Sequence, residues 1–363
     1  MEYLLIGAAL LVAFSNGAND NFKGFATVWG SDTLSYRSAL ILATVATVAG
    51  SAVSLLLADT LVQQFSGKGL VPDAVASAPL FLASVGAGTA LTVFIATRAG
   101  LPISTTHALI GGLIGAALGQ HGGEIHYAKL AGSFLLPLVT SPLIAAALGL
   151  VIYPLARRRA MQNHCACVLP PVSLAEPAEN GAVLMQAAAP GLIIAPQAQC
   201  DTLPQPMARF SLARLADQVH TLSGALICFA RGVNDTPKLA ALLLASHLFQ
   251  ASVSVLAIAA IMAAGGLLYA RRVAVTMSQR VTRMDSAQGL TANLITAALV
   301  LLASKLGLPV STTHVAVGAI AGVGAGARSI DWSTVNNIVL SWLATLPLAA
   351  VLAWLATLAV RTL

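Results

Sequence analysis

Two short polar motifs that could bind ions each occur twice in this sequence. The first reads Phe14-Ser-Asn-Gly-Ala-Asn-Asp20-Asn-Phe-Lys23 and returns as Phe229-Ala-Arg-Gly-Val-Asn-Asp235-Thr-Pro-Lys238. Both copies interrupt apolar segments, and a carboxylate inside such a segment marks a functional site by default. Glycine permits an unwound turn, whose freed carbonyls and neighbouring Asn and Asp oxygens suit Na⁺. The motif predicts broken helices with a sodium or other coupling-ion site formed by Asn19, Asp20, Asn234 and Asp235. The alternative is that Asn and Asp only cap a second half-helix.

The second motif reads Gly100-Leu-Pro-Ile-Ser-Thr-Thr-His107 and returns as Gly307-Leu-Pro-Val-Ser-Thr-Thr-His314. Proline followed by hydroxyl residues is typical of a helix start, where the first N–H groups have no partners within the helix. These N–H groups, the positive end of the helix dipole and three hydroxyls favour a tetrahedral oxyanion. The predicted anion ligands are Ser104, Thr105, Thr106, Ser311, Thr312 and Thr313. The alternative is that the hydroxyls only satisfy the helix ends.

Each copy of the second motif ends in a histidine and continues into a glycine-rich stretch. His107 and His314 lie three residues after a serine, on roughly the same helix face, where they could relay a proton near neutral pH. Packing is the equally weighted alternative for both imidazoles. The glycines from Gly111 to Gly115 and from Gly318 to Gly324 predict close helix packing rather than a nucleotide-binding loop.

The composition places these motifs in a membrane protein. Of 363 residues, 57% are hydrophobic and only 9% are charged, with a mean hydropathy of +0.84. Soluble domains carry about 25% charged residues, and a dispersed net charge of +6 excludes a nucleic-acid binder. Stretches of membrane-spanning length run over about 39–57, 79–97, 130–155, 248–270, 287–303 and 335–360.

The chain divides into two halves that repeat each other. The proline-rich segment 157–207 is predicted to be a poorly ordered hydrophilic linker between a first membrane repeat, 1–156, and a second, 208–363. The copies of the two motifs lie 215 and 207 residues apart, in the same order, which indicates a duplication.

The placement of basic residues predicts how the halves are oriented. The linker begins with Arg157 to Arg159, and a second loop carries Arg271, Arg272, Arg280 and Arg283. By the positive-inside rule both are cytoplasmic, which puts the N-terminus outside and an odd number of segments in each half. The fold class predicted is an all-α polytopic membrane protein of two inverted-topology repeats with broken helices. Whether the segments flanking Pro102 and Pro309 cross fully or form re-entrant hairpins stays open.

The duplicated motifs resemble those of the inorganic phosphate transporter (PiT) family, which includes sodium-phosphate symporters and some sulfate permeases. The similarity covers both membrane halves and excludes the linker. It implies a homodimer of inverted repeats in which the Ser-Thr-Thr segments hold the anion and the Asn and Asp residues hold coupling cations.

This chain departs from the family pattern at Lys23 and Lys238, where the family usually has asparagine. Residues at i and i+3 share a helix face, so each lysine can approach Asp20 or Asp235. The four charges then sum to zero, whereas two carboxylates alone would need bound cations before a dianion could enter. We expect the lysines to replace part of the sodium, leaving transport weakly sodium-dependent, proton-coupled or uncoupled. The alternative is that both lysines extend toward the membrane interface.

The function predicted is secondary active transport of inorganic phosphate across the plasma (inner) membrane by alternating access, coupled to sodium or protons, with no enzymatic activity. Sulfate is the alternative substrate, because pairing of both carboxylates with lysine removes the repulsion that would reject it. Arsenate is expected to pass as a phosphate mimic. A membrane hydrolase is disfavoured because no Gly-x-Ser-x-Gly motif is present. A channel would differ from a carrier in showing no counterflow.

Overall fold

The computed structural model describes residues 1–57, 59–120, 124–157, 164–169, 173–177, 183–187, 190–202, 207–281 and 284–361. Arg158, Arg159 and Arg283, on which part of the predicted orientation rests, lie outside these ranges. The chain forms a helical unit, Met1–Ala156 with His220–Leu363, and a smaller unit, Arg157–Val219.

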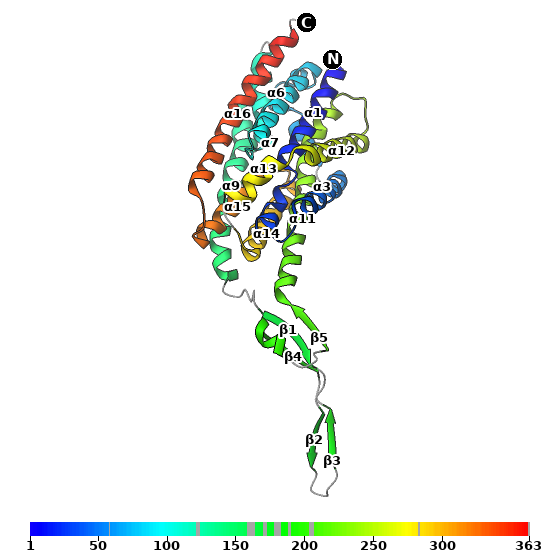
Figure 1. Ribbon diagram of the computed structural model, residues 1–363. Coiled ribbons are helices and arrows are strands. Elements are labelled where there is room, and N and C mark those ends of the chain that lie inside the picture. The colour runs from blue at the N-terminus through cyan, green and yellow to red at the C-terminus, as the bar shows by residue number, and fades with distance from the viewer. Residues whose placement is uncertain are drawn as a thin grey trace. The chain divides into compact units, whose positions relative to one another are not determined.

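The first half of the helical unit contains helices α1 to α9 (Figure 1). Their bounds are α1 Glu2–Asp20, α2 Ala26–Gly30, α3 Tyr36–Leu57, α4 Asp59–Phe65, α5 Asp73–Ala76, α6 Pro79–Arg98, α7 Thr105–Gly119, α8 Tyr127–Lys129 and α9 Leu136–Arg157. A 3₁₀ turn, Lys23–Phe25, precedes α2, and a π-helical stretch, Leu130–Leu135, joins α8 to α9.

The second half repeats the order of the long helices. Its elements are α11 Leu212–Leu244, α12 Ala251–Tyr269, α13 Arg271–Val275, a π-helical stretch Thr276–Arg280, α14 Ser286–Lys305, α15 Thr312–Ala327 and α16 Trp332–Arg361. In chain order α1, α3, α6, α7 and α9 correspond to α11, α12, α14, α15 and α16. The predicted duplication therefore has a matching sequence of helices.

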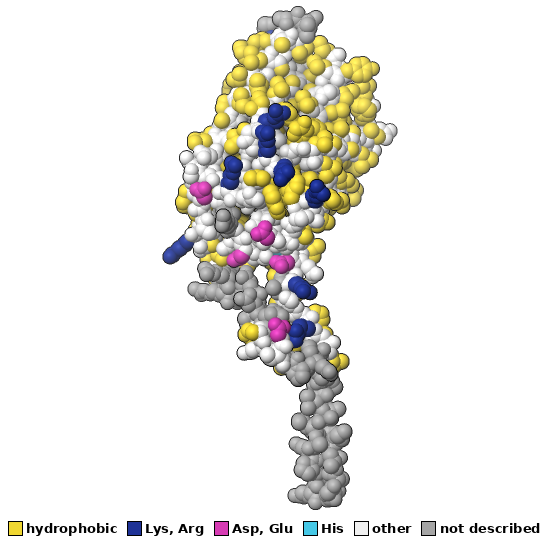
Figure 2. Space-filling view, viewed as in Figure 1, with side chains coloured by type: hydrophobic (Ala, Val, Ile, Leu, Met, Phe, Trp, Pro, Cys, Tyr) yellow, Lys and Arg dark blue, Asp and Glu magenta, His cyan; other side chains and the backbone are white. Residues whose placement is uncertain are grey.

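Among the described residues, six helices are long and apolar enough to cross a membrane. They are Tyr36–Leu56, Pro79–Arg98, Tyr127–Leu155, Ala251–Tyr269, Ser286–Lys305 and Trp332–Arg361, so the six predicted spans are confirmed. Large apolar side chains such as Leu56, Leu268 and Leu343 are more than two-thirds exposed. Figure 2 shows apolar side chains over most of this face of the helical unit. A surface of this kind suits lipid rather than water.

The glycines bring helices of the two halves into close contact. A Cβ on Gly17 of α1 would lie 1.9 Å from the carbonyl oxygen of Met262 in α12, and one on Gly232 of α11 would lie 2.2 Å from that of Thr47 in α3. Each half therefore packs its first helix against the second helix of the other half.

The glycine-rich stretches also pack against helices of the opposite half. Gly115 of α7 abuts the backbone of Ala350 in α16, and Gly322 of α15 abuts that of Ala146 in α9. Close helix packing was predicted for these glycines and is confirmed, because any side chain there would overlap the neighbouring backbone.

The predicted break at the first motif comes later than expected in the first half and is absent from α11 in the second. Helix α1 continues through Gly17 to Asp20, and α11 runs without interruption from Leu212 to Leu244, through Gly232 and Pro237. The chain leaves α-helical geometry only after Asp20, in the turn before Lys23–Phe25. The physical reason is the packing above: these two glycines admit a neighbouring helix rather than an unwound turn.

The smaller unit adds β-structure to the predicted all-α fold. Its described residues form β1 His164–Leu169, β2 Ser173–Pro177, β3 Val183–Ala187, β4 Gly191–Pro196, α10 Gln197–Thr202 and β5 Ala208–Ser211. One antiparallel sheet has the order β4-β1-β5, and β2 pairs with β3. Runs such as Gly191-Leu-Ile-Ile-Ala-Pro196 contain enough β-branched residues for short strands despite the prolines around them.

Candidate functional site

The two aspartates of the repeated motif meet at one amide. Asn16 Nδ2 lies 3.1 Å from Asp20 Oδ2 and 3.4 Å from Asp235 Oδ2, and it also donates to Thr105 Oγ1 at 2.9 Å. Asp20 is 2% exposed and Asp235 is 5% exposed. Two carboxylates that share a donor in a dry interior repel each other unless cations compensate them. The structure thus brings together the aspartates of both halves, and it adds Asn16, which the sequence did not single out as a ligand.

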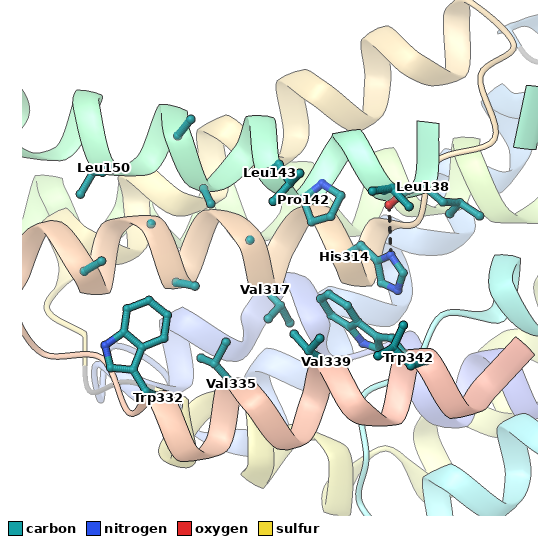
Figure 3. A pocket seen from close by; sticks show the side chains of 18 of the residues that line it. Leu138, Pro142, Leu143, Leu150, His314, Val317, Trp332, Val335, Val339 and Trp342 are labelled. Atoms are coloured by element: carbon teal, nitrogen blue, oxygen red, sulfur yellow. Dashed lines mark hydrogen bonds between the residues drawn. The ribbon is translucent and has the colours of Figure 1, made fainter. Parts of the chain in front are cut away.

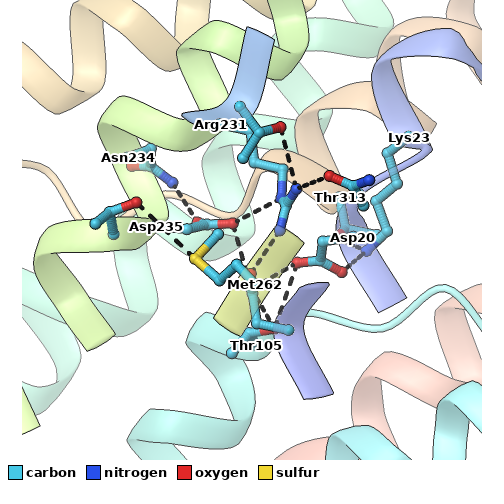
Figure 4. Close-up of polar contacts among 12 residues, drawn as sticks. Asp20, Lys23, Thr105, Arg231, Asn234, Asp235, Met262 and Thr313 are labelled. Carbon is cyan, nitrogen blue, oxygen red and sulfur yellow. Dashed lines mark hydrogen bonds and ion pairs between the residues drawn. The ribbon is translucent and has the colours of Figure 1, made fainter. Parts of the chain in front are cut away.

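Both lysines supply that compensation. Lys23 forms an ion pair with Asp20 (Figure 4). Lys238 Nζ lies 3.7 Å from Asp235 Oδ1. Lys23 and Lys238 are 3% and 1% exposed. The alternative in which the lysines extend to the membrane interface is therefore wrong. Because an unpaired charge near the bilayer centre costs about 3 kcal/mol, pairing inside the protein is the favourable arrangement.

Each ammonium also joins the two halves of the protein. Lys23 donates to the Ile103 carbonyl at 2.9 Å and to the Thr313 hydroxyl. Lys238 donates to the Val310 carbonyl at 2.8 Å and to Thr106 Oγ1 at 3.0 Å. Ile103 and Val310 occupy equivalent positions in the repeated motif, as do Thr106 and Thr313. Each lysine therefore binds the loop of its own half and the helix start of the other.

A third cation enters the site from α11. Arg231 is 1% exposed, its Nη2 donates to Asn16 Oδ1 at 2.6 Å, and its Nε lies 3.5 Å from Asp235 Oδ2. The sequence reasoning summed four charges to zero and left this one out. Arg231 stands 215 residues after Asn16, at the equivalent position of the first motif, so aligning the two copies would have found both residues.

The predicted helix starts at the second motif are confirmed. Helix α7 begins after Ser104 and α15 after Ser311, and each serine hydroxyl accepts from the backbone N–H three residues on, at 3.1 and 3.3 Å. These serines therefore cap their helices while keeping a hydroxyl proton free to donate. Thr105 Oγ1 donates to Asp20 Oδ2 at 3.3 Å, and Thr312 is buried in the first turn of α15.

The two motif asparagines hold the loops that lead into α7 and α15. Asn19 donates to the Leu101 carbonyl at 3.0 Å and accepts from the Ile103 N–H at 3.2 Å. Asn234 donates to the Val310 carbonyl at 3.3 Å and accepts from Ser304 Oγ at 3.2 Å. The carboxylates are the stronger candidates for binding a cation, because they carry a negative charge that the neutral amide oxygens lack.

The two histidines face a groove outside this cluster. Their rings lie 4.5 Å apart, and His314 stacks on Trp342 at 3.9 Å. The groove has a volume of about 530 Å³ and is lined by apolar residues of α9, α15 and α16 (Figure 3). His314 Nδ1 approaches the Leu138 carbonyl at 3.5 Å. Within the described structure, neither imidazole hydrogen-bonds to an aspartate, lysine or threonine of the cluster, which favours the packing interpretation.

A small cavity lies within the cluster, and in this structure it is too tight to hold a water molecule. It is lined by Asn16, Thr105, Thr106, Leu109, Asp235, Lys238 and Leu239. It therefore presents hydroxyl, amide and ammonium donors beside one carboxylate. Such a set can bind a small oxyanion that both accepts and donates hydrogen bonds.

The family model of the phosphate transporter family matches residues 16–353. This protein belongs to the phosphate transporter family. The match includes the ion-binding candidates of both polar motifs and extends over both halves of the helical unit, so this is a membrane transport protein rather than an enzyme.

Relatives and a solved structure agree with this assignment. A Pyrococcus abyssi protein named as a phosphate permease is 26% identical over 96% of this chain and 95% of its own length. The chloroplastic inorganic phosphate transporter 2-1 of Arabidopsis thaliana is 29% identical over 97% of this chain and 71% of its own. The structure is similar to that of a sodium-dependent phosphate transporter, with a TM-score of 0.76, 21% identity and coverage of 100% and 99% of the two chains. This last likeness shows the fold.

Proposed function

We propose that this protein carries inorganic phosphate across the plasma (inner) membrane by alternating access, and that Lys23 and Lys238 replace coupling cations at the binding site. One observation carries the proposal: the reciprocal contacts in which each lysine pairs with its own aspartate and reaches a threonine of the opposite half. In this arrangement built-in ammonium groups compensate two buried carboxylates, which is the electrostatic task of a bound sodium ion.

The anion would bind at the cavity beside the start of α7, which would have to widen toward the start of α15 to admit it. The starts of α7 and α15 present hydroxyls and first-turn N–H groups from opposite halves. The residues are Ser104, Thr105 and Thr106 at the start of α7, and Ser311, Thr312 and Thr313 at the start of α15. As the anion enters, each ammonium would exchange its threonine or carbonyl acceptor for an oxygen of the anion. The remaining cation ligands, Asp20 and Asp235, would hold sodium only where a lysine has moved away.

The reciprocal packing supports inverted repeats. In the contacts of α1 with α12 and of α11 with α3, the first helix of each half packs against the second helix of the other half. A pseudo-twofold axis between inverted repeats requires such reciprocal contacts. Helices α7 and α15 have 15 and 16 residues, about 22–24 Å at 1.5 Å per residue, which is shorter than the membrane core. This length favours re-entrant segments. We further propose an external N-terminus, a cytoplasmic linker and a homodimer.

Sulfate is the second candidate substrate. Both carboxylates of the site have cationic partners, so neither is left to repel an anion without protons. Arsenate would be carried along with phosphate because it has the same shape and protonation chemistry.

The function is tested by uptake of labelled phosphate and sulfate into proteoliposomes, with the sodium and pH gradients varied separately. The proposal expects saturable phosphate uptake that continues without sodium, together with counterflow when the vesicles are preloaded. Absence of phosphate uptake with uptake of sulfate would transfer the function to the second candidate. A flux without saturation or counterflow would indicate a channel and contradict alternating access.

A further inference from the structure

Arg231 breaks the symmetry of an otherwise repeated site. The equivalent residue of the first half is Asn16, a neutral amide, and Arg231 hydrogen-bonds directly to it. A second nitrogen, Nη1, lies 3.2 Å from Asn21 Oδ1 and 3.4 Å from Thr47 Oγ1. These contacts hold the guanidinium between α1, α3 and α11. The lysines and aspartates occur in both halves, whereas this cation occurs in one.

The guanidinium leaves the buried cluster with one positive charge in excess. Asp20 and Asp235 contribute two negative charges, and Lys23, Lys238 and Arg231 contribute three positive ones. Among the described residues, no other Asp, Glu, Lys or Arg is buried. Arg231 Nε has no hydrogen-bond partner in the described structure and faces Asp235 Oδ2 at 3.5 Å. The excess charge therefore lies beside the cavity that Asn16, Asp235 and Lys238 line.

We propose that Arg231 is a specificity-determining residue that fits the site to a monovalent oxyanion, dihydrogen phosphate, rather than to a dianion. This rests on the proposed function. A monoanion makes the closed site neutral, whereas a dianion leaves it with a net negative charge inside the membrane, which is unfavourable. Arg231 acts through its charge on the cavity, because its Nη1 and Nη2 nitrogens are held by Asn16, Asn21 and Thr47.

The proton of the substrate strengthens the same preference. Dihydrogen phosphate has two hydroxyl donors, and the cavity contains the carboxylate of Asp235, which accepts. Sulfate has no proton at neutral pH, so it satisfies the ammonium and hydroxyl groups but donates no hydrogen bond to the carboxylate. Charge and hydrogen bonding therefore select against sulfate together.

The test is exchange of labelled phosphate across proteoliposomes with equal pH on both sides, so that no proton gradient drives the flux. At fixed total phosphate, exchange by the unaltered protein should rise as pH falls through the second ionisation of phosphate. Sulfate, whose charge is constant over this range, should compete poorly at every pH. Exchange that rises with the dianion, or strong competition by sulfate, would overturn the inference. No exchange at any pH would instead contradict the proposed function.

Three variants separate charge from structural support. Arg231→Lys keeps the charge and should keep the pH profile, whereas Arg231→Gln keeps an amide near Asn16 and should lower exchange by about 10–100-fold. Asp235→Asn adds one positive charge and should shift preference toward sulfate and reverse the pH profile. If the buried charges had only a structural role, changing the net charge of the site would not reverse the pH profile. Arg37→Gln, which removes an exposed arginine at the start of α3, is the matched control.

The variants also determine how the inference fails. Exchange at the unaltered rate by Arg231→Gln, or an unchanged phosphate preference in Asp235→Asn, would overturn it. If Arg231→Gln does not yield folded protein, the pH profile of the unaltered protein and the selectivity of Asp235→Asn still decide the outcome.

Discussion

The ammonium of Lys238 in the second half donates to the hydroxyl of Thr106 in the first half, across 3.0 Å. Lys23 makes the equivalent contact with Thr313. The lysines therefore do more than neutralise their aspartates, because they also connect the two halves of the site. In this closed arrangement, the side chains of the protein satisfy the donors and acceptors that the substrate would use.

Removing either of these threonine hydroxyls should weaken the closed state. In Thr106→Val or Thr313→Val, a buried ammonium loses one acceptor, which costs about 1–3 kcal/mol. Uptake should fall about tenfold in each variant, and by similar factors, because the two contacts are equivalent. The measurement is the initial rate of phosphate uptake into proteoliposomes.

Thr92→Val is the control for this pair. Its hydroxyl is buried in α6 but donates to the Gly88 carbonyl of its own helix at 2.8 Å, away from the cluster. It should retain nearly full uptake. If Thr106→Val behaves like Thr92→Val, the contact with Lys238 has no part in transport.

The motif serines should show two separable roles. Each caps its helix, so Ser104→Ala and Ser311→Ala should each lower the unfolding free energy by about 1 kcal/mol. If the serine hydroxyl protons also bind the anion, the double alanine variant loses uptake although it folds. Serine-to-threonine variants, which keep both cap and hydroxyl, should retain it. Thermal unfolding in detergent and uptake measure the two roles. Unchanged uptake in the folded double variant would remove both serines from the site.

The glycines of α1 provide a test of the packing between halves. Gly17→Ala should destabilise the protein by about 1–3 kcal/mol, because the new Cβ would lie 1.9 Å from the Met262 carbonyl oxygen. Gly7 is in the same helix with nothing within 4 Å of a Cβ, so Gly7→Ala should be neutral or stabilising. Unfolding of the two purified variants compares them directly. Equal stability would contradict the close contact of α1 with α12.

The predictions about the site that the structure confirms came from features that occur twice in the sequence. The motif copies predicted both helix starts, and the spacing of three residues predicted the pairing of Lys23 with Asp20. Sequence reasoning failed at Gly17 and Gly232, because a glycine that admits a neighbouring helix and one that unwinds a helix look the same in sequence. The structure decides between them through the position of the Met262 and Thr47 backbone.

Two further features depended on tertiary structure. The exchange of partners between halves, such as Lys238 with Thr106, joins residues 132 positions apart and has no local signal. Arg231 was visible in the motif but differs from Asn16, so a comparison that looked for what repeats passed over it. Its burial beside Asp235 was needed to show that the site has one positive charge in excess.

The central claim is that built-in ammonium groups do the electrostatic work of sodium, and it predicts how sodium dependence responds to the lysines. The double variant Lys23→Asn and Lys238→Asn puts a neutral amide at both positions and leaves Arg231, which pairs with Asp235, as the one buried cation among the described residues. It should therefore take up phosphate only when sodium is present.

The most direct measurement is the initial rate of phosphate uptake by the unaltered protein and by this double variant, in matched proteoliposomes with sodium or with choline outside. The account predicts similar rates in both media for the unaltered protein and a strong requirement for sodium in the variant. A full requirement for sodium in the unaltered protein would contradict it.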